Sequence, residues 1–202
     1  MASEQRHLDP AYRTVLLLSA GLNLAMFLLE GGIGLAVGSA ALIADAADFL
    51  EDTAAYTLAA LAIGWSSRSR AWVGVAQGTA MGLVGLTAVA EIIRRLIEGG
   101  APSPTAVGAT AMLALAVNGF CAWRLVRFRS GDASMRSIWL STRNDAVLNG
   151  LTILAAGLIF VTKTGWPDIF AGALIAAINL WASAEVLMAA RREMNRTPGT
   201  DA

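Results

Sequence analysis

Six long apolar stretches dominate the sequence and limit what the chain can fold into. A helical residue rises about 1.5 Å, so about 20 apolar residues cross a hydrocarbon core about 30 Å thick. That core offers no water to free backbone groups, so apolar stretches of this length form helices rather than open strands. The six stretches cover residues 15–37, 40–65, 72–93, 105–126, 138–161 and 169–190. The sequence therefore predicts an all-α integral membrane protein with six transmembrane helices.

The composition supports a membrane location and excludes several other classes of protein. Of the 202 residues, 56% are hydrophobic and 15% are charged, whereas soluble domains carry about 25% charged residues. The net charge of zero lacks the basic excess of nucleic-acid-binding proteins, and the hydrophobicity is too high for a disordered chain. The single cysteine, Cys121, excludes a disulfide scaffold. The apolar stretches hold no group of His, Cys and Lys suited to acid–base or nucleophilic chemistry, so we predict neither an enzyme nor a bound cofactor.

Short polar segments flank one membrane domain. We assign residues 1–13 to an N-terminal tail, 14–192 to the six-helix domain and 193–202 to a short tail that is too small to fold alone. The first apolar stretch is longer than the hydrophobic region of a signal peptide and contains Asn23 and Glu30. A permanent helix is therefore favoured over the alternative, a cleaved signal sequence.

The basic residues predict the orientation in the membrane. Six spans place both termini on the same side. Of the 15 basic residues, only Arg94, Arg95 and Lys163 fall on the other side. Because cytoplasmic segments carry an excess of Lys and Arg, we expect both termini in the cytoplasm and the protein in the cell (inner) membrane.

Acidic residues within the apolar stretches need an explanation, because an ionised Asp at mid-membrane costs about 2.5–3.5 kcal/mol. Helical spacing places the four acids of the second stretch on one face. Among them, Asp48 and Asp52 lie one turn apart and are best placed to bind one ion together. The acids that lie in apolar stretches without matching bases are Glu30, Asp45, Asp48, Glu51, Asp52, Glu91 and Asp145.

The fifth stretch carries a complementary polar stripe. Its members are Ser141, Asp145, Asn149 and Thr152, which fall within about 80° of one another around a helix, and Asn144, about 60° further round. Arg143 points to the opposite side, where its stem reaches the headgroups. If this stripe faces the second stretch, three carboxylates and several neutral oxygens surround one point, which suits a divalent cation.

Other polar residues of the spans have both a functional and a structural interpretation. The candidates for lining the ion path or supporting the ligands are Asp45, Glu51, Asn23 and Glu30. Glu51 and Glu91 could equally lie near an interface or be satisfied by neighbours. Asn23 and Asn118 could simply form interhelical hydrogen bonds. For Asp168, at the start of the last helix, capping is the favoured role.

Three motifs resemble the cation diffusion facilitator family. Its second helix begins with a Ser-x-Ala-Leu-x-Ala-Asp-Ala run followed by a His-or-Asp-x-x-x-Asp pair, and residues 38–52 here read GSAALIADAADFLED. The family carries a second such pair in its fifth helix and a Gly-Trp-x-Asp turn before its sixth. Here residues 141–145 read STRND and residues 165–168 read GWPD. Helix by helix, the chain resembles that family's membrane domain.

The resemblance implies six helices, cytoplasmic termini, and export of zinc or a similar divalent metal in exchange for protons. Carried over by position, Asp48, Asp52 and Asp145 match the metal ligands, and Ser141 stands at the fourth ligand position. A hydroxyl is a weaker ligand than imidazole. Either Asn144 or Asn149 supplements the Ser141 hydroxyl as a ligand, or the site is weaker and richer in oxygen than a zinc site. The metal preference of the site then moves toward manganese, iron or cobalt.

The chain departs from the family pattern in two places. The cytoplasmic metal-sensing domain that usually follows the sixth helix is absent, as is a His-rich loop between the fourth and fifth helices. The sequence therefore resembles a short branch of the family that has the membrane domain only. Glycines 31, 32 and 34, or 78, 82 and 85, could support a homodimer through transmembrane helices, or could pack within one monomer.

The predicted function is proton-coupled efflux of zinc, cobalt, cadmium, iron or manganese from the cytoplasm. The metal is the transported substrate and protons are the counter-ion, because metal ligands must lose their protons to bind the ion. The alternative is a non-transporting membrane subunit of the same fold that pairs with or regulates another carrier. The missing imidazole favours that alternative, whereas the intact acidic face argues against it.

Overall fold

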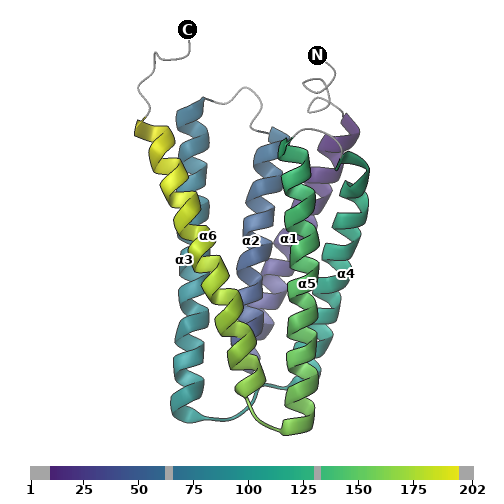
Figure 1. The fold of residues 1–202 in the computed structure, drawn as a ribbon, viewed down its shortest axis with the longest axis vertical. Coiled ribbons are helices and arrows are strands. Elements are labelled where there is room, and N and C mark those ends of the chain that lie inside the picture. The colour runs from purple at the N-terminus through teal and green to yellow at the C-terminus, as the bar shows by residue number, and fades with distance from the viewer. Residues whose placement is uncertain (1–9, 62–65, 130–132, 196–202) are drawn as a thin grey trace.

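A computed structural model describes residues 10–61, 66–129 and 133–195 of the chain (Figure 1). Within these ranges the backbone is helical, without a strand, which confirms the all-α class. The long helices and one short 3-10 helix are α1 (Pro10–Val37), α2 (Ala40–Leu61), α3 (Ser67–Glu98), α4 (Pro104–Leu125), η2 (Val126–Phe128), α5 (Ala133–Thr162) and α6 (Trp166–Asn195). Both terminal helices extend into the segments assigned above to tails, since α1 begins at Pro10 and α6 ends at Asn195. The end of the second apolar stretch, residues 62–65, lies outside the described residues.

Five of these helices are long and apolar enough to cross a membrane, namely all of the long ones except α2. Helix α2 is set apart by its four acidic residues, not by its length of 22 residues. It lies in the middle of the bundle, where α1, α3 and α6 pack against it (Figure 1). Its neighbours bury most of its surface, so its polar face is kept away from lipid.

Two helix pairs flank this central helix. Helices α3 and α6 pack along each other on one side, and α4 packs with α5 on the other (Figure 1). Helix α5 meets α2 only sparsely. The start of α1 and the end of α6 lie at the same end of the bundle, as an even number of passes requires; the α1–α2, α3–α4 and α5–α6 connections lie at the opposite end.

Glycines of α3 form a close-packing seam with α6. A Cβ added at Gly78 or Gly82 would lie 2.8 Å from Leu187 or 2.9 Å from Ser183, respectively. The Ser183 hydroxyl donates a hydrogen bond of 2.7 Å to the Gly78 carbonyl, which ties the two backbones together. Gly85 and Gly34 likewise meet neighbours within the chain. For these glycines packing within one monomer is confirmed, and a homodimer stays a prediction.

The start of α2 is capped by a residue of another helix. Asp168, in the first turn of α6, accepts a hydrogen bond of 2.5 Å from the Ser39 hydroxyl and one of 2.7 Å from the Ala40 backbone N–H. The Ser39 hydroxyl in turn accepts a bond from the Leu42 N–H. A capping role was expected for Asp168, but the helix that it caps is α2 rather than its own. The acid-bearing helix therefore begins at a fixed point on α6.

The end of α1 is held by Arg95 of α3. Its guanidinium donates to the Gly38 and Val37 carbonyls at 2.9 and 2.7 Å, which satisfies carbonyls at the C-terminus of α1. Glu91 pairs with both Arg94 and Arg95, at 2.5 and 3.2 Å. The expectation that Glu91 lacks a matching base is therefore wrong, because residues three and four positions further on lie on the same face of a helix.

Candidate cation site

The carboxylates of α2 lie inside the bundle. Asp45 is 0% exposed, Asp52 is 4% and Asp48 is 8%, while Glu51 is half-buried. Their spacing of i, i+3, i+6 and i+7, which places them on one face of α2, also places them at the centre of the molecule. No salt bridge joins any of the four to a Lys or Arg of the described residues. Such buried charge without a basic partner is typical of an ion pathway.

The Asp52 carboxyl is held by a tyrosine one turn further along α2. The Tyr56 hydroxyl donates a hydrogen bond of 2.5 Å to Asp52 Oδ2. The same hydroxyl is in hydrogen-bond contact with the hydroxyl of Thr142 on α5. Both Tyr56 and Thr142 are 0% exposed. Sequence reasoning missed this pair, although a tyrosine four residues after a buried acid was a usable signal.

The polar stripe of α5 is divided between the interior and the surface. Asp145 is half-buried and close enough to Asp52 and Asp48 for their charges to interact. Asn149 is 0% exposed; its amide nitrogen donates to the Asp145 backbone carbonyl at 2.7 Å, and its Oδ1 has no partner among the residues that the structure describes. Thr152 is buried as well. These side chains lie where a stripe facing α2 would place them.

Ser141 and Asn144 lie on the exposed side of α5. Asn144 accepts a hydrogen bond of 3.2 Å from Arg143, and it is Thr142 that points into the bundle. The rotation of α5 about its own axis explains the difference, because one position along a helix turns the side chain by about 100°. The structure therefore brings Asn149 to the interior but not Ser141 or Asn144.

A second pair of carboxylates joins α1 to α2. Glu30 is 0% exposed and neighbours Asp45, with Asp48 also near. No other group of the described residues donates a hydrogen bond to the four oxygens of Glu30 and Asp45, so each carboxyl group has the other as its nearest polar neighbour. This pair lies on the side of Asp48 that is nearer the start of α2. An uncompensated pair of buried charges is costly, so these groups need a proton or another cation.

Asparagines complete the polar interior. Asn23 donates to the Ser19 carbonyl of its own helix at 2.8 Å and contacts Cys121 Sγ of α4 at 3.8 Å; a role for Asn23 in lining the ion path stays a prediction. Asn179 of α6, which sequence reasoning missed, donates to the Ala44 carbonyl at 2.7 Å and neighbours Asp48. The feature that could have pointed to Asn179 in the sequence is an amide side chain within the otherwise apolar sixth stretch. The Oδ1 atoms of Asn23 and Asn179 are buried and have no hydrogen-bond partner in the part of the chain that the structure describes.

The ligand candidates do not form a closed cage. Among residues 10–61, 66–129 and 133–195, no three His, Cys, Asp or Glu side chains converge closely enough to hold a metal ion. Asp48 and Asp52 belong to α2, whereas Asp145 belongs to α5, which touches α2 only sparsely. Binding of one ion by all three carboxylates therefore requires their side chains, or α5 itself, to move closer together than in this structure.

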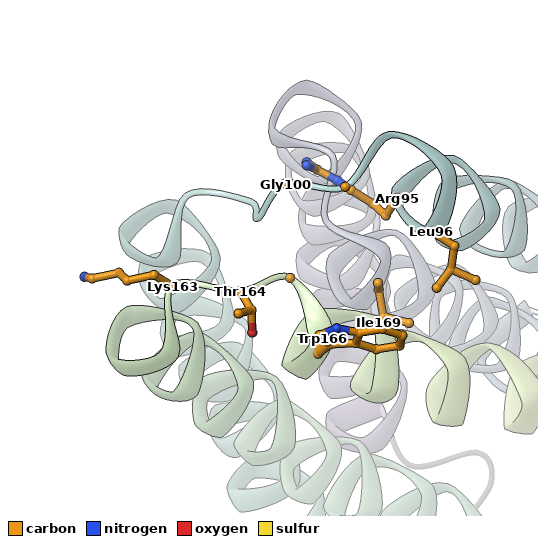
Figure 2. Close-up of a pocket in the computed structure, with 9 residues that line it drawn as sticks. Arg95, Leu96, Gly100, Lys163, Thr164, Trp166 and Ile169 are labelled. Atoms are coloured by element: carbon orange, nitrogen blue, oxygen red, sulfur yellow. The ribbon is translucent and has the colours of Figure 1, made fainter.

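A pocket of about 300 Å³ lies at the opposite end of the bundle, away from these carboxylates. Figure 2 shows Trp166 and Ile169 side by side in its wall, with the Lys163 side chain directed away from them. An apolar groove of about 410 Å³ between α5 and α6 shares Thr164 and Trp166 with this pocket. Neither space is lined by an Asp or Glu, so neither belongs to the candidate cation site.

Comparison with known proteins identifies the family. The model of the cation efflux transmembrane domain matches residues 16–194, a segment that includes α2 and α5 and every candidate ligand. No curated protein matches the chain. The family match agrees with the bundle of apolar helices around a buried acidic face. The chain therefore belongs to the cation efflux family, whose members are multi-pass membrane transporters of cations.

Proposed function

We propose that this protein exports a divalent metal cation from the cytoplasm in exchange for protons. One observation carries the proposal: Asp48 and Asp52 lie one turn apart, both more than nine-tenths buried, with no salt bridge from the described residues. A scaffold without transport function would gain stability if such acids were replaced by apolar residues. A passing cation supplies the missing positive charge.

The ligand chemistry suits an oxygen-binding divalent metal. Asp48, Asp52 and Asp145 supply carboxylate oxygens, and Asn149 Oδ1, which is buried and unpartnered, is the best-placed neutral oxygen. Oxygen ligands bind manganese, iron and cobalt as well as zinc and cadmium, so the site is not restricted to zinc. This set replaces the Ser141 hydroxyl by the amide oxygen of Asn149, which lies about two helical turns further along α5 and in the interior of the bundle.

Proton exchange follows from the same carboxylates. A carboxylate must lose its proton before it binds a metal, so arrival of the metal from the cytoplasm releases protons, and protons entering from the other side displace the metal. Alternation between the two states moves α5 relative to α2. Glu30 and Asp45, which lie nearer the start of α2 than Asp48 does, are the candidates to accept the protons that the metal displaces and to return them when the metal leaves.

Transport by purified protein in proteoliposomes tests the proposal. With a pH gradient imposed, we expect a flux of one or more of zinc, cobalt, cadmium, iron and manganese that stops when the gradient is collapsed. A protein that binds metal but moves none would be the non-transporting subunit instead. Accessibility labelling of cysteines placed near each terminus checks that both termini face the cytoplasm.

The fourth ligand can be identified by paired substitutions on α5. We expect Asn149→Ala to weaken metal binding about 10-fold or more, as loss of a ligand-supporting group does, because its Oδ1 lies in the interior. We expect Ser141→Ala to bind as the parent does, because Ser141 is exposed. Calorimetric titration measures both. The assignment is wrong if Ser141→Ala loses more affinity than Asn149→Ala, or if Ser141→His shifts the preference toward zinc.

A further inference from the structure

Tyr56 is the place where α2 and α5 are joined next to the candidate ligands. Its hydroxyl contacts Asp52 Oδ2 on its own helix and Thr142 Oγ1 on α5. Thr142 Oγ1 also lies 2.9 Å from the Ile138 carbonyl of its own helix; because Tyr56 gives its proton to Asp52, the link between the helices forms when Thr142 donates its proton to Tyr56 rather than to Ile138. Since α5 packs on α2 only sparsely, this contact is the hydrogen bond that the described residues form between the helix with Asp48 and Asp52 and the helix with Asp145.

The tyrosine ring is fixed by apolar packing. Tyr56 is the largest of the fully buried side chains among the described residues. Its ring lies in a core cluster with Tyr12, Leu16 and Leu125, so helices α1 and α4 enclose it. A ring held on several sides presents its hydroxyl at one position. Tyr56 therefore has the rigidity that a residue needs to orient a neighbouring ligand.

We propose that Tyr56 is a positioning and specificity-determining residue of the metal site, an inference that rests on the proposed function. Its hydrogen bond occupies Asp52 Oδ2 and leaves Oδ1 as the oxygen that meets the ion. Asp52 is thereby a one-oxygen ligand. Its link to Thr142 sets how closely α5, and so Asp145, approaches the α2 pair.

The number of oxygens that Asp52 offers affects which metals bind. Larger cations such as calcium take six to eight oxygens and often bind a carboxylate through both, whereas zinc is held by about four ligands. A tyrosine that reserves one oxygen favours the smaller ions. Without the tyrosine hydroxyl, both oxygens of Asp52 become available and its orientation is no longer fixed.

Tyr56→Phe tests the inference, because phenylalanine keeps the ring and removes only the hydroxyl. In proteoliposomes we expect the apparent KM for the best-transported metal to rise about 10- to 100-fold, with a smaller change in maximal rate. We also expect the preference to move toward larger divalent ions, measured as the ratio of cadmium to zinc transport. The matched control is Thr53→Val, which removes an α2 hydroxyl whose one hydrogen bond among the described residues goes to the Phe49 carbonyl of its own helix.

Variants of the partner residue separate positioning from folding. Thr142→Val is expected to raise KM, as Tyr56→Phe does. Thr142→Ser keeps the hydroxyl and is expected to transport metal as the parent does. If Tyr56 had a purely structural role, its loss would reduce the amount of folded protein, and with it the maximal rate, but would leave KM and the metal preference unchanged. That result would overturn the inference. If the parent itself moves no metal, the proposed function fails first.

Discussion

Replacing Asp48 with asparagine is expected to abolish metal transport and to leave the protein at least as stable as the parent. Asparagine has nearly the shape of aspartate but no charge. Asp48 lies in the interior with Oδ2 unpartnered and with Asp45, Glu51 and Asp52 as its negatively charged neighbours. Its charge therefore serves the cation and opposes folding.

The two effects have different sizes and separate measurements. Loss of a carboxylate that contacts the ion should lower metal affinity by at least about 100-fold, beyond what loss of a supporting group costs. Asparagine is still a buried polar group but carries no charge, and an unpaired charge is the costlier group to bury, so the free energy of unfolding should be unchanged or higher. Titration with metal gives the affinity, and thermal unfolding in detergent without metal gives the stability.

The control for Asp48→Asn is an acid that is outside the interior. Glu185 of α6 is exposed, and Glu185→Gln should keep both the transport rate and the melting temperature of the parent. Asp48→Asn protein that transports metal at the parental rate would remove Asp48 from the ligand set. A variant that unfolds at a lower temperature yet binds metal normally would show that Asp48 is a structural residue.

Sequence periodicity predicted those features that depend on one helix at a time. The hydropathy of the apolar stretches predicted the helices, and the spacing of Asp45, Asp48 and Asp52 predicted their common face. Helix α2 carries too many charged residues to be recognised as a span from its composition alone. It was predicted because the apolar stretch 40–65 is long enough to cross a membrane and because it begins with the family motif. The resemblance to the family, carried by the same residues, is confirmed by the family match.

Features that depend on how two helices meet could not be predicted. The stripe of α5 was correct as a pattern, but its rotation relative to α2 decides that Thr142 rather than Ser141 points inward. Asp168 was expected to cap a helix, yet only the packing of α6 on α2 shows which one. A repeating pattern specifies a face and leaves open the neighbour that covers it.

The packing of α6 on the start of α2 gives the second large prediction: Gly172→Ala should destabilise the protein and impair transport together. A Cβ at Gly172 would lie 2.6 Å from the Ala40 carbonyl carbon and 2.8 Å from the Ala41 nitrogen. Both are backbone atoms, which cannot move without the helix. Forced overpacking of this kind costs about 1–3 kcal/mol, which lowers the melting temperature by several degrees.

Transport is affected because the same contact positions α2. Moving Ala40 away from α6 stretches its hydrogen bond to Asp168, and Asp48 and Asp52 lie only two to three turns further along the same helix. Gly157→Ala is the matched control, since a Cβ there meets nothing within 4 Å; it should melt no lower than the parent, as alanine is favoured over glycine in a helix by up to about 1 kcal/mol. Equal melting temperatures and equal transport rates for the two alanine variants would mean that the α2–α6 contact is looser than described and does not hold the carboxylates in place.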